Sequence, residues 1–166
     1  MKLKIIKSPR QCKVYDENEN LVAVVHNKLL NMDKNIENIK DKETFSTSIV
    51  NSENCYVFDS DGNEVAYGVI KDEKSDSFKQ AFFGASEKVM IEFGEDSYVA
   101  ERTKGDNLVI KKQGVDEEFV SDITNVYDIS KRTSIISSDT DMSITTLIVI
   151  FIFARYLYDS KFTIMV

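Results

Sequence analysis

One apolar run near the end of the sequence constrains the fold most. Its fourteen positions, from Ile144 to Leu157, are nearly all apolar, apart from two threonines and Arg155. The apolar side chains would cover every face of a helix, so such a helix must be enclosed on all sides. A membrane or the interior of the protein could enclose such a helix. Alternatively, the run could form two buried strands instead of a helix.

Local signals favour a helix for this run. Its β-branched residues favour strand conformation, but no turn signal divides a run that is too long for an ordinary strand. Asp139 and Asp141 suit the positive end of a helix dipole, and Arg155 and Lys161 suit its negative end. The N-cap candidates are Ser138, Asp139 and Thr140. The sequence predicts a buried C-terminal helix over approximately residues 140–158.

A membrane anchor is the weaker way to enclose this helix. Fourteen residues make a helix about 21 Å long, short of a hydrocarbon core about 30 Å thick. The polar stretch Asp159–Lys161 follows at once and carries no basic cluster to fix a membrane orientation. A closed β-barrel of about twelve strands has a lumen wide enough to hold the helix.

A β-hairpin is duplicated in the first half of the chain. The stretches 12–25 and 55–68 align at an offset of 43 residues, and each predicts a strand, a polar turn and a second strand. The identical pairs are Cys12/Cys55, Val14/Val57, Asp16/Asp59, Asn20/Asn63, Val22/Val65 and Ala23/Ala66. Asp59 does not begin an EF-hand, because glycine comes fourth and position twelve is Ile70. A tight turn explains Gly62 and Asn63 better.

The rest of the chain consists of short strand patterns with polar breaks, which is typical of an antiparallel barrel or sandwich. We expect residues 1–166 to form one mainly β domain. Leu29, Met32, Ile36 and Ile39 recur near a helical period and predict a short helix or an ordered loop. The predicted strands are 3–6, 11–16, 21–26, 44–50, 54–58, 65–71, 78–83, 89–93, 97–102, 108–112, 118–128 (broken at Thr124–Asn125) and 134–137.

These patterns together resemble the tubby C-terminal-like superfamily, with its LURP-one-related and phospholipid-scramblase-like branches nearest. The resemblance rests on Val14-Tyr15-Asp16 with Leu21-Val22-Ala23, on Val57-Phe58-Asp59 with Gly62, Val65 and Ala66, and on the apolar C-terminal helix. It implies a twelve-stranded antiparallel barrel wrapped around a central hydrophobic helix. It also implies lipid or phosphoinositide binding as one function, although no matching basic cluster stands out in the sequence.

No catalytic, metal-binding or cofactor-binding motif is present in the sequence. It contains no G-x-S-x-G, H-E-x-x-H, P-loop, dinucleotide fingerprint or paired C-x-x-C. His26 is the only histidine, and a site of Cys12, His26 and Cys55 would lack the fourth ligand of structural zinc. Asp116–Glu118 indicates a solvated turn. We therefore expect that the protein is not an enzyme and binds no cofactor. We also expect both cysteines to be buried and unreactive.

The net negative charge limits which partners the protein can bind. The net charge of −7 repels nucleic acid and anionic lipid, and the dipeptides Lys111-Lys112 and Lys131-Arg132 look like isolated, solvated strand edges. Two cysteines and no secretory signal fit a cytoplasmic protein. We expect a binding or scaffold module for a protein partner or a small apolar ligand, at the barrel rim or outer face. The alternative is a peripheral or tethered membrane-lipid protein.

Overall fold

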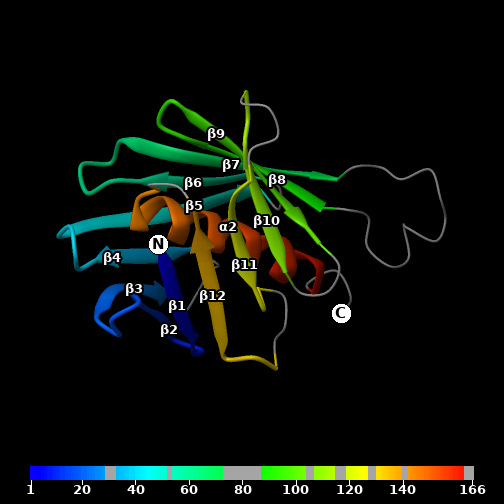
Figure 1. Cartoon of the computed structure of the whole chain (residues 1–166). Helices are drawn as coiled ribbons and strands as arrows, with labels where there is room; N and C mark the ends of the chain where they lie inside the picture. Colours follow the sequence, from blue (N-terminus) through cyan, green and yellow to red (C-terminus); the bar gives the residue numbers. More distant parts are fainter. Residues whose placement is uncertain are drawn as a thin grey trace.

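Twelve β-strands form a closed antiparallel barrel in the computed structural model, which describes residues 1–28, 33–51, 54–72, 87–103, 107–114, 119–126, 130–139 and 142–162 (Figure 1). Each strand pairs with its neighbours in sequence, and β1 closes the barrel on β12. The strands are β1 (Lys2–Lys7), β2 (Gln11–Tyr15), β3 (Leu21–Asn27), β4 (Lys34–Asn38), β5 (Glu43–Asn51), β6 (Asn54–Phe58), β7 (Glu64–Asp72), β8 (Glu87–Phe93), β9 (Asp96–Arg102), β10 (Leu108–Lys112), β11 (Phe119–Thr124) and β12 (Thr133–Ser138). The predicted barrel is confirmed.

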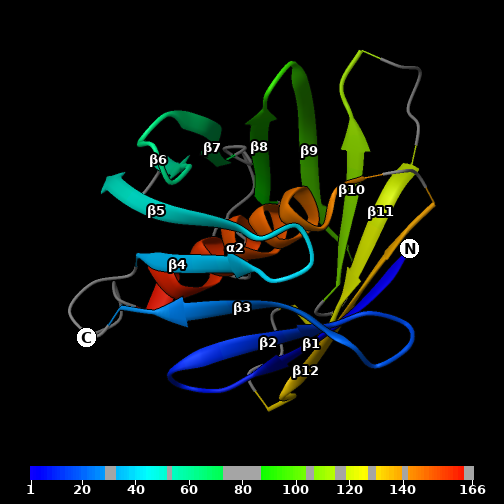
Figure 2. The ribbon, with the colours of Figure 1, turned by 90° about the vertical axis from the view of Figure 1, so that its left-hand side faces the viewer.

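Helix α2 (Ile144–Phe162) runs through the lumen of this barrel (Figure 2). The consecutive residues Leu147, Ile148, Val149 and Ile150 are all fully buried, although they point to different sides of the helix. The barrel wall therefore encloses every face of this segment, as the apolar run predicts. Across the described residues, no helix combines the length and apolar character that crossing a membrane requires.

The helix begins later than the sequence predicts. Ser143 is its N-cap: the Ser143 hydroxyl accepts a hydrogen bond from the Thr146 amide at 3.0 Å, and the Ser143 carbonyl accepts one from the Leu147 amide. Ser138 is used differently, as the last residue of β12, where its hydroxyl donates to the Val120 carbonyl. The predicted start near residue 140 is four residues too early: Ser138 belongs to β12, and Ser143, which was not among the candidates, caps the helix.

Close contact between α2 and β7 fixes the helix against the barrel wall. An added Cβ on Gly68 would lie 2.5 Å from two carbons of the Phe153 ring. Phe153 is only 1% exposed, so its ring has no solvent-filled space to move into. Glycine at this position of β7 thus makes room for the phenyl ring.

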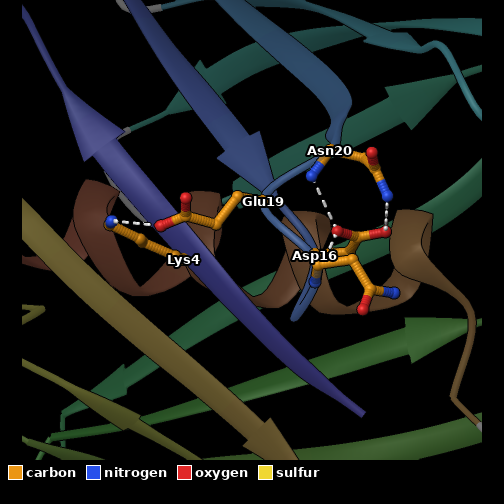
Figure 3. A network of polar contacts seen from close by, with 5 residues as sticks. Lys4, Asp16, Glu19 and Asn20 are labelled. Carbon is orange, nitrogen blue, oxygen red and sulfur yellow. Dashed lines mark hydrogen bonds and ion pairs between the residues drawn. The ribbon is translucent and has the colours of Figure 1, made fainter.

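Both copies of the duplicated hairpin form the same turn. Asp16 accepts hydrogen bonds from the Asn20 amide and side chain (Figure 3). In the second copy, Asp59 accepts the matching bonds from Asn63. Each copy has a β-bulge at the same place, between Val14 and Tyr15 and 43 residues later. The aspartate therefore serves as a turn residue in both copies, as its spacing predicts.

One secondary-structure prediction is wrong, and one cannot be compared. Residues 34–38, where a helix or loop was expected, form β4, which pairs with β3 and β5. Ile36 is buried against these neighbours, whereas Ile39 is exposed, so the apparent helical period does not follow one buried face. Leu29, Met32 and the predicted strand 78–83 lie outside the described residues.

Two further predictions concern the break after β11 and the end of α2. The predicted break at Thr124–Asn125 is confirmed, because β11 ends at Thr124 and Asn125 has a φ of +58°. The helix ends at Phe162, four residues beyond the predicted end near 158, so Lys161 lies in its last turn and Arg155 does not.

Candidate functional site

The three residues that the sequence offers for chemistry do not form one site. His26 lies on the outer side of β3, where its Nε2 is 3.9 Å from the Glu37 carboxylate, beside a groove of about 400 Å³. Cys55 is buried on β6, and burial raises its pKa to about 12, which keeps it a neutral thiol. Cys12 is half-buried on β2 and is likewise a free thiol.

Carboxylates also fail to build a metal site in the described part of the chain. No group of three or more His, Cys, Asp or Glu side chains there is arranged to hold a metal ion. Asp59 uses both carboxylate oxygens in its turn, and Asp116–Glu118 lies outside the described residues.

Charge is distributed unevenly between the two ends of the barrel. Hairpin turns alternate between the ends in this topology, and the end at which α2 begins is marked by the bond from Asn38 to Thr145, 2.8 Å long. The described acidic turn residues at that end are Asp16, Glu17, Glu19, Asp41, Asp59, Asp61, Glu95 and Asp139, with two lysines, Lys40 and Lys42. The described charged turn residues at the other end are Arg10, Lys28, Asp33, Lys131 and Arg132. Among the described turn residues, positive charges thus outnumber negative ones at this end.

We call one of the hollows at this end the basic mouth. It has a volume of about 430 Å³ and is lined by Lys7, Ser8, Pro9, Lys131, Arg132 and Arg155. Lys7 comes from the end of β1, Lys131 and Arg132 precede β12, and Arg155 projects from α2. The neighbouring strands β1 and β12 hold the first three together: the Lys7 amide bonds to the Arg132 carbonyl at 2.7 Å.

Two carbonyls after β11 hold two of these cations in position. Asn125 adopts a left-handed conformation, which asparagine tolerates better than most residues. Its carbonyl accepts a hydrogen bond from Lys7 Nζ at 3.0 Å, and the next carbonyl, that of Val126, accepts one from Arg155 Nη1 at 3.1 Å. The strand break predicted at this point thus helps to place an ammonium and a guanidinium at the mouth.

A smaller cavity adjoins the basic mouth, and we call it the apolar annex. Its volume is about 100 Å³, and it shares Lys7, Ser8 and Arg155 with the mouth. Its apolar lining is Cys12, Val25, Phe151 and Ile152, and Asn27 and Lys34 complete it. Burial raises the pKa of the Cys12 thiol, although positive charge on Arg155, Lys34 and Lys7 opposes that rise. The Cys12 thiol thus stays neutral although these three cations line the same cavity.

This arrangement suits an anion, and sequence reasoning missed it. Lysine and arginine side chains bind phosphate and carboxylate through charge-assisted hydrogen bonds, and arginine does so with a planar fork. Lys131-Arg132, expected as an isolated strand edge, instead lies in a hollow with Lys7 and Arg155. No local sequence signal marked this hollow, because Lys7 lies more than a hundred positions from Lys131 and Arg132. The other dipeptide, Lys111-Lys112, lies at the opposite end of the barrel, where the two lysines face Glu101 and Asp96.

Comparisons with protein-family models, curated proteins and solved structures found no match to this chain. The tubby-like resemblance therefore stays a prediction.

Proposed function

We propose that this protein is a non-catalytic, cytoplasmic binding module that recognises a small anion at the basic mouth. The observation that carries the proposal is the convergence of Lys7, Lys131, Arg132 and Arg155 on one hollow of about 430 Å³. The hollow lies at the barrel rim, where the sequence already favoured a ligand. Free thiols on Cys12 and Cys55 are consistent with a reducing compartment.

The site has the chemistry of a binding site rather than of a catalytic one. Its polar groups are cations and one hydroxyl, and the Ser8 hydroxyl donates to the Gln11 carbonyl at 2.7 Å. Neither histidine nor cysteine lines the mouth to act as general base or nucleophile. Binding an anion requires only the positive charges and their placement.

The test is calorimetric titration of the full chain with inorganic phosphate at low ionic strength. We expect binding that weakens as salt is added, because salt screens charges at an open site. Lys131→Gln/Arg132→Gln should weaken binding about tenfold or more, since hydrogen bonds to charged groups contribute about 1.5–3 kcal/mol each.

A second dipeptide supplies the matched control. Lys111→Gln/Lys112→Gln changes the net charge by the same amount but removes two cations from the acidic end of the barrel. Compared at about 0.15 M ionic strength, it should leave phosphate affinity within about twofold, because exposed charges more than about 8 Å apart are then largely screened. Absence of binding to the unaltered protein, or equal losses in the two double variants, would overturn the proposal.

A lipid headgroup carries the same phosphate chemistry, so vesicles form a separate arm of the test. We expect the protein not to float with neutral or anionic liposomes. Flotation that survives high salt would favour the membrane-lipid alternative, because salt weakens charge contacts but not apolar insertion.

A further inference from the structure

The apolar annex bears on which anion the mouth would hold. Cys12 on β2, Val25 on β3, and Phe151 and Ile152 on α2 give the annex an apolar wall. Val25, Phe151 and Ile152 are each at most 3% exposed, so they belong to the packed core. The annex therefore leads from a charged rim to the edge of the hydrophobic interior.

Two features make the annex and the mouth parts of one site. Lys7, Ser8 and Arg155 line both hollows, so a group on these cations lies directly beside the annex. Arg155 and Phe151 are also one helical turn apart on α2, and therefore lie on the same side of the helix. The anion and the apolar wall are thus at neighbouring positions along one helix face.

Size limits what the annex can accept. A cavity of about 150 Å³ holds benzene, and the annex is smaller at about 100 Å³. In proportion to the six carbons of benzene, a chain of about three or four carbons fits. Two fatty acyl chains, a steroid or a fused ring system are too large.

We infer that the ligand is a small amphipathic anion: a phosphate or carboxylate carrying a short aliphatic chain of about three or four carbons. Its charged group lies on Lys7, Lys131, Arg132 and Arg155, and its chain enters the annex between Cys12, Val25, Phe151 and Ile152. This inference rests on the proposed anion site and specifies the ligand class for it.

The experiment is calorimetric titration of the full chain with inorganic phosphate and then with methyl, ethyl, propyl, butyl and hexyl phosphate. Each carbon that enters the annex should tighten binding about fourfold, from the free energy of burying one methylene. The gain should stop after about three or four carbons, when the annex is full. The matching neutral alcohols should not bind, because they lack the charge.

Two substitutions at Cys12 test the annex itself, with the ratio of propyl phosphate to inorganic phosphate affinity as the readout. Cys12→Leu should bring this ratio close to one by filling the annex. Cys12→Ala should enlarge the annex, so that affinity continues to rise for longer alkyl chains than in the unaltered protein. The ratio cancels any change that a variant makes to the anion site alone.

The possible results separate the two proposals. If inorganic phosphate binds but the alkyl series is flat, the annex inference is overturned and the anion site stands. If no phosphate compound binds, both are overturned. Affinity that keeps rising through hexyl phosphate, or a ratio that Cys12→Leu does not change, would also overturn the inference, because the chains would then lie on open surface.

Discussion

A substitution at Gly68 offers the sharpest test of how α2 sits in the barrel. A Cβ at this position would lie 2.5 Å from Cδ2 and Cε2 of Phe153 and 3.1 Å from Cγ. Carbon atoms prefer about 3.5–4.0 Å, so the ring or the strand must move by about an ångström. Overpacking of this kind costs about 1–3 kcal/mol, and we expect Gly68→Ala to lower the free energy of unfolding by that amount.

A double-mutant cycle separates this contact from other effects. Phe153→Leu alone removes part of a buried ring, which we expect to cost about 1–3 kcal/mol. The combined Gly68→Ala/Phe153→Leu variant should be more stable than the sum of the single losses predicts, by about 1–2 kcal/mol, because the smaller side chain leaves room for the new methyl. Urea unfolding followed by circular dichroism measures each value, and unchanged m-values would show that only stability has changed.

Gly62 supplies the control for this cycle. An added Cβ there meets nothing within 4 Å, although its φ of +84° makes alanine strained. Gly62→Ala should therefore destabilise the protein, yet combine additively with Phe153→Leu. The reasoning would be refuted if Gly68→Ala cost nothing, or if its cycle with Phe153→Leu were additive within about 0.5 kcal/mol.

Three other perturbations test the core, the turns and the placement of the site. Ile150→Asp puts a carboxylate at a fully buried position, at a penalty of several kcal/mol against a typical total stability of about 5–15 kcal/mol. It should be molten or insoluble by near-ultraviolet circular dichroism, whereas Ile150→Val should cost only about 0.5–1.5 kcal/mol. Deleting the chain from Met142 onward empties the lumen, and a remaining fragment that unfolds cooperatively with β-structure would contradict the enclosed helix. The hydrogen bonds from Asn20 and Asn63 lower the pKa of Asp16 and Asp59 below the usual 3.8. The stability that these hydrogen bonds give the folded protein is therefore fully present above pH 3.8 and is lost as the pH falls through the lowered pKa. The double variant Asp16→Ala/Asp59→Ala should therefore lose less stability than the unaltered protein in acid titrations. His26→Gln should leave phosphate binding unchanged in the same calorimetric assay, because His26 lines neither the mouth nor the annex.

Sequence alone was sufficient wherever the signal is local or repeats with a fixed period. The run from Ile144 to Leu157 carries apolar side chains on every face, and only full enclosure satisfies such a helix. The Asp-x-x-x-Asn spacing predicts the turn because aspartate bonds to backbone amides only two and four residues away. These interactions act over a few residues, so they can be read before the chain is folded.

Contacts between distant segments determined what the sequence left open. Residues 34–38 are a strand because β3 and β5 supply their hydrogen bonds on both sides. Helix α2 starts at Ile144 because Ser143 caps it, whereas Ser138 is paired in β12. The basic mouth exists because barrel closure brings Lys7 beside Arg132, while the enclosed helix brings Arg155 to the same end. No local pattern links residues that lie more than a hundred positions apart, and only closure of the barrel places their charges around one hollow.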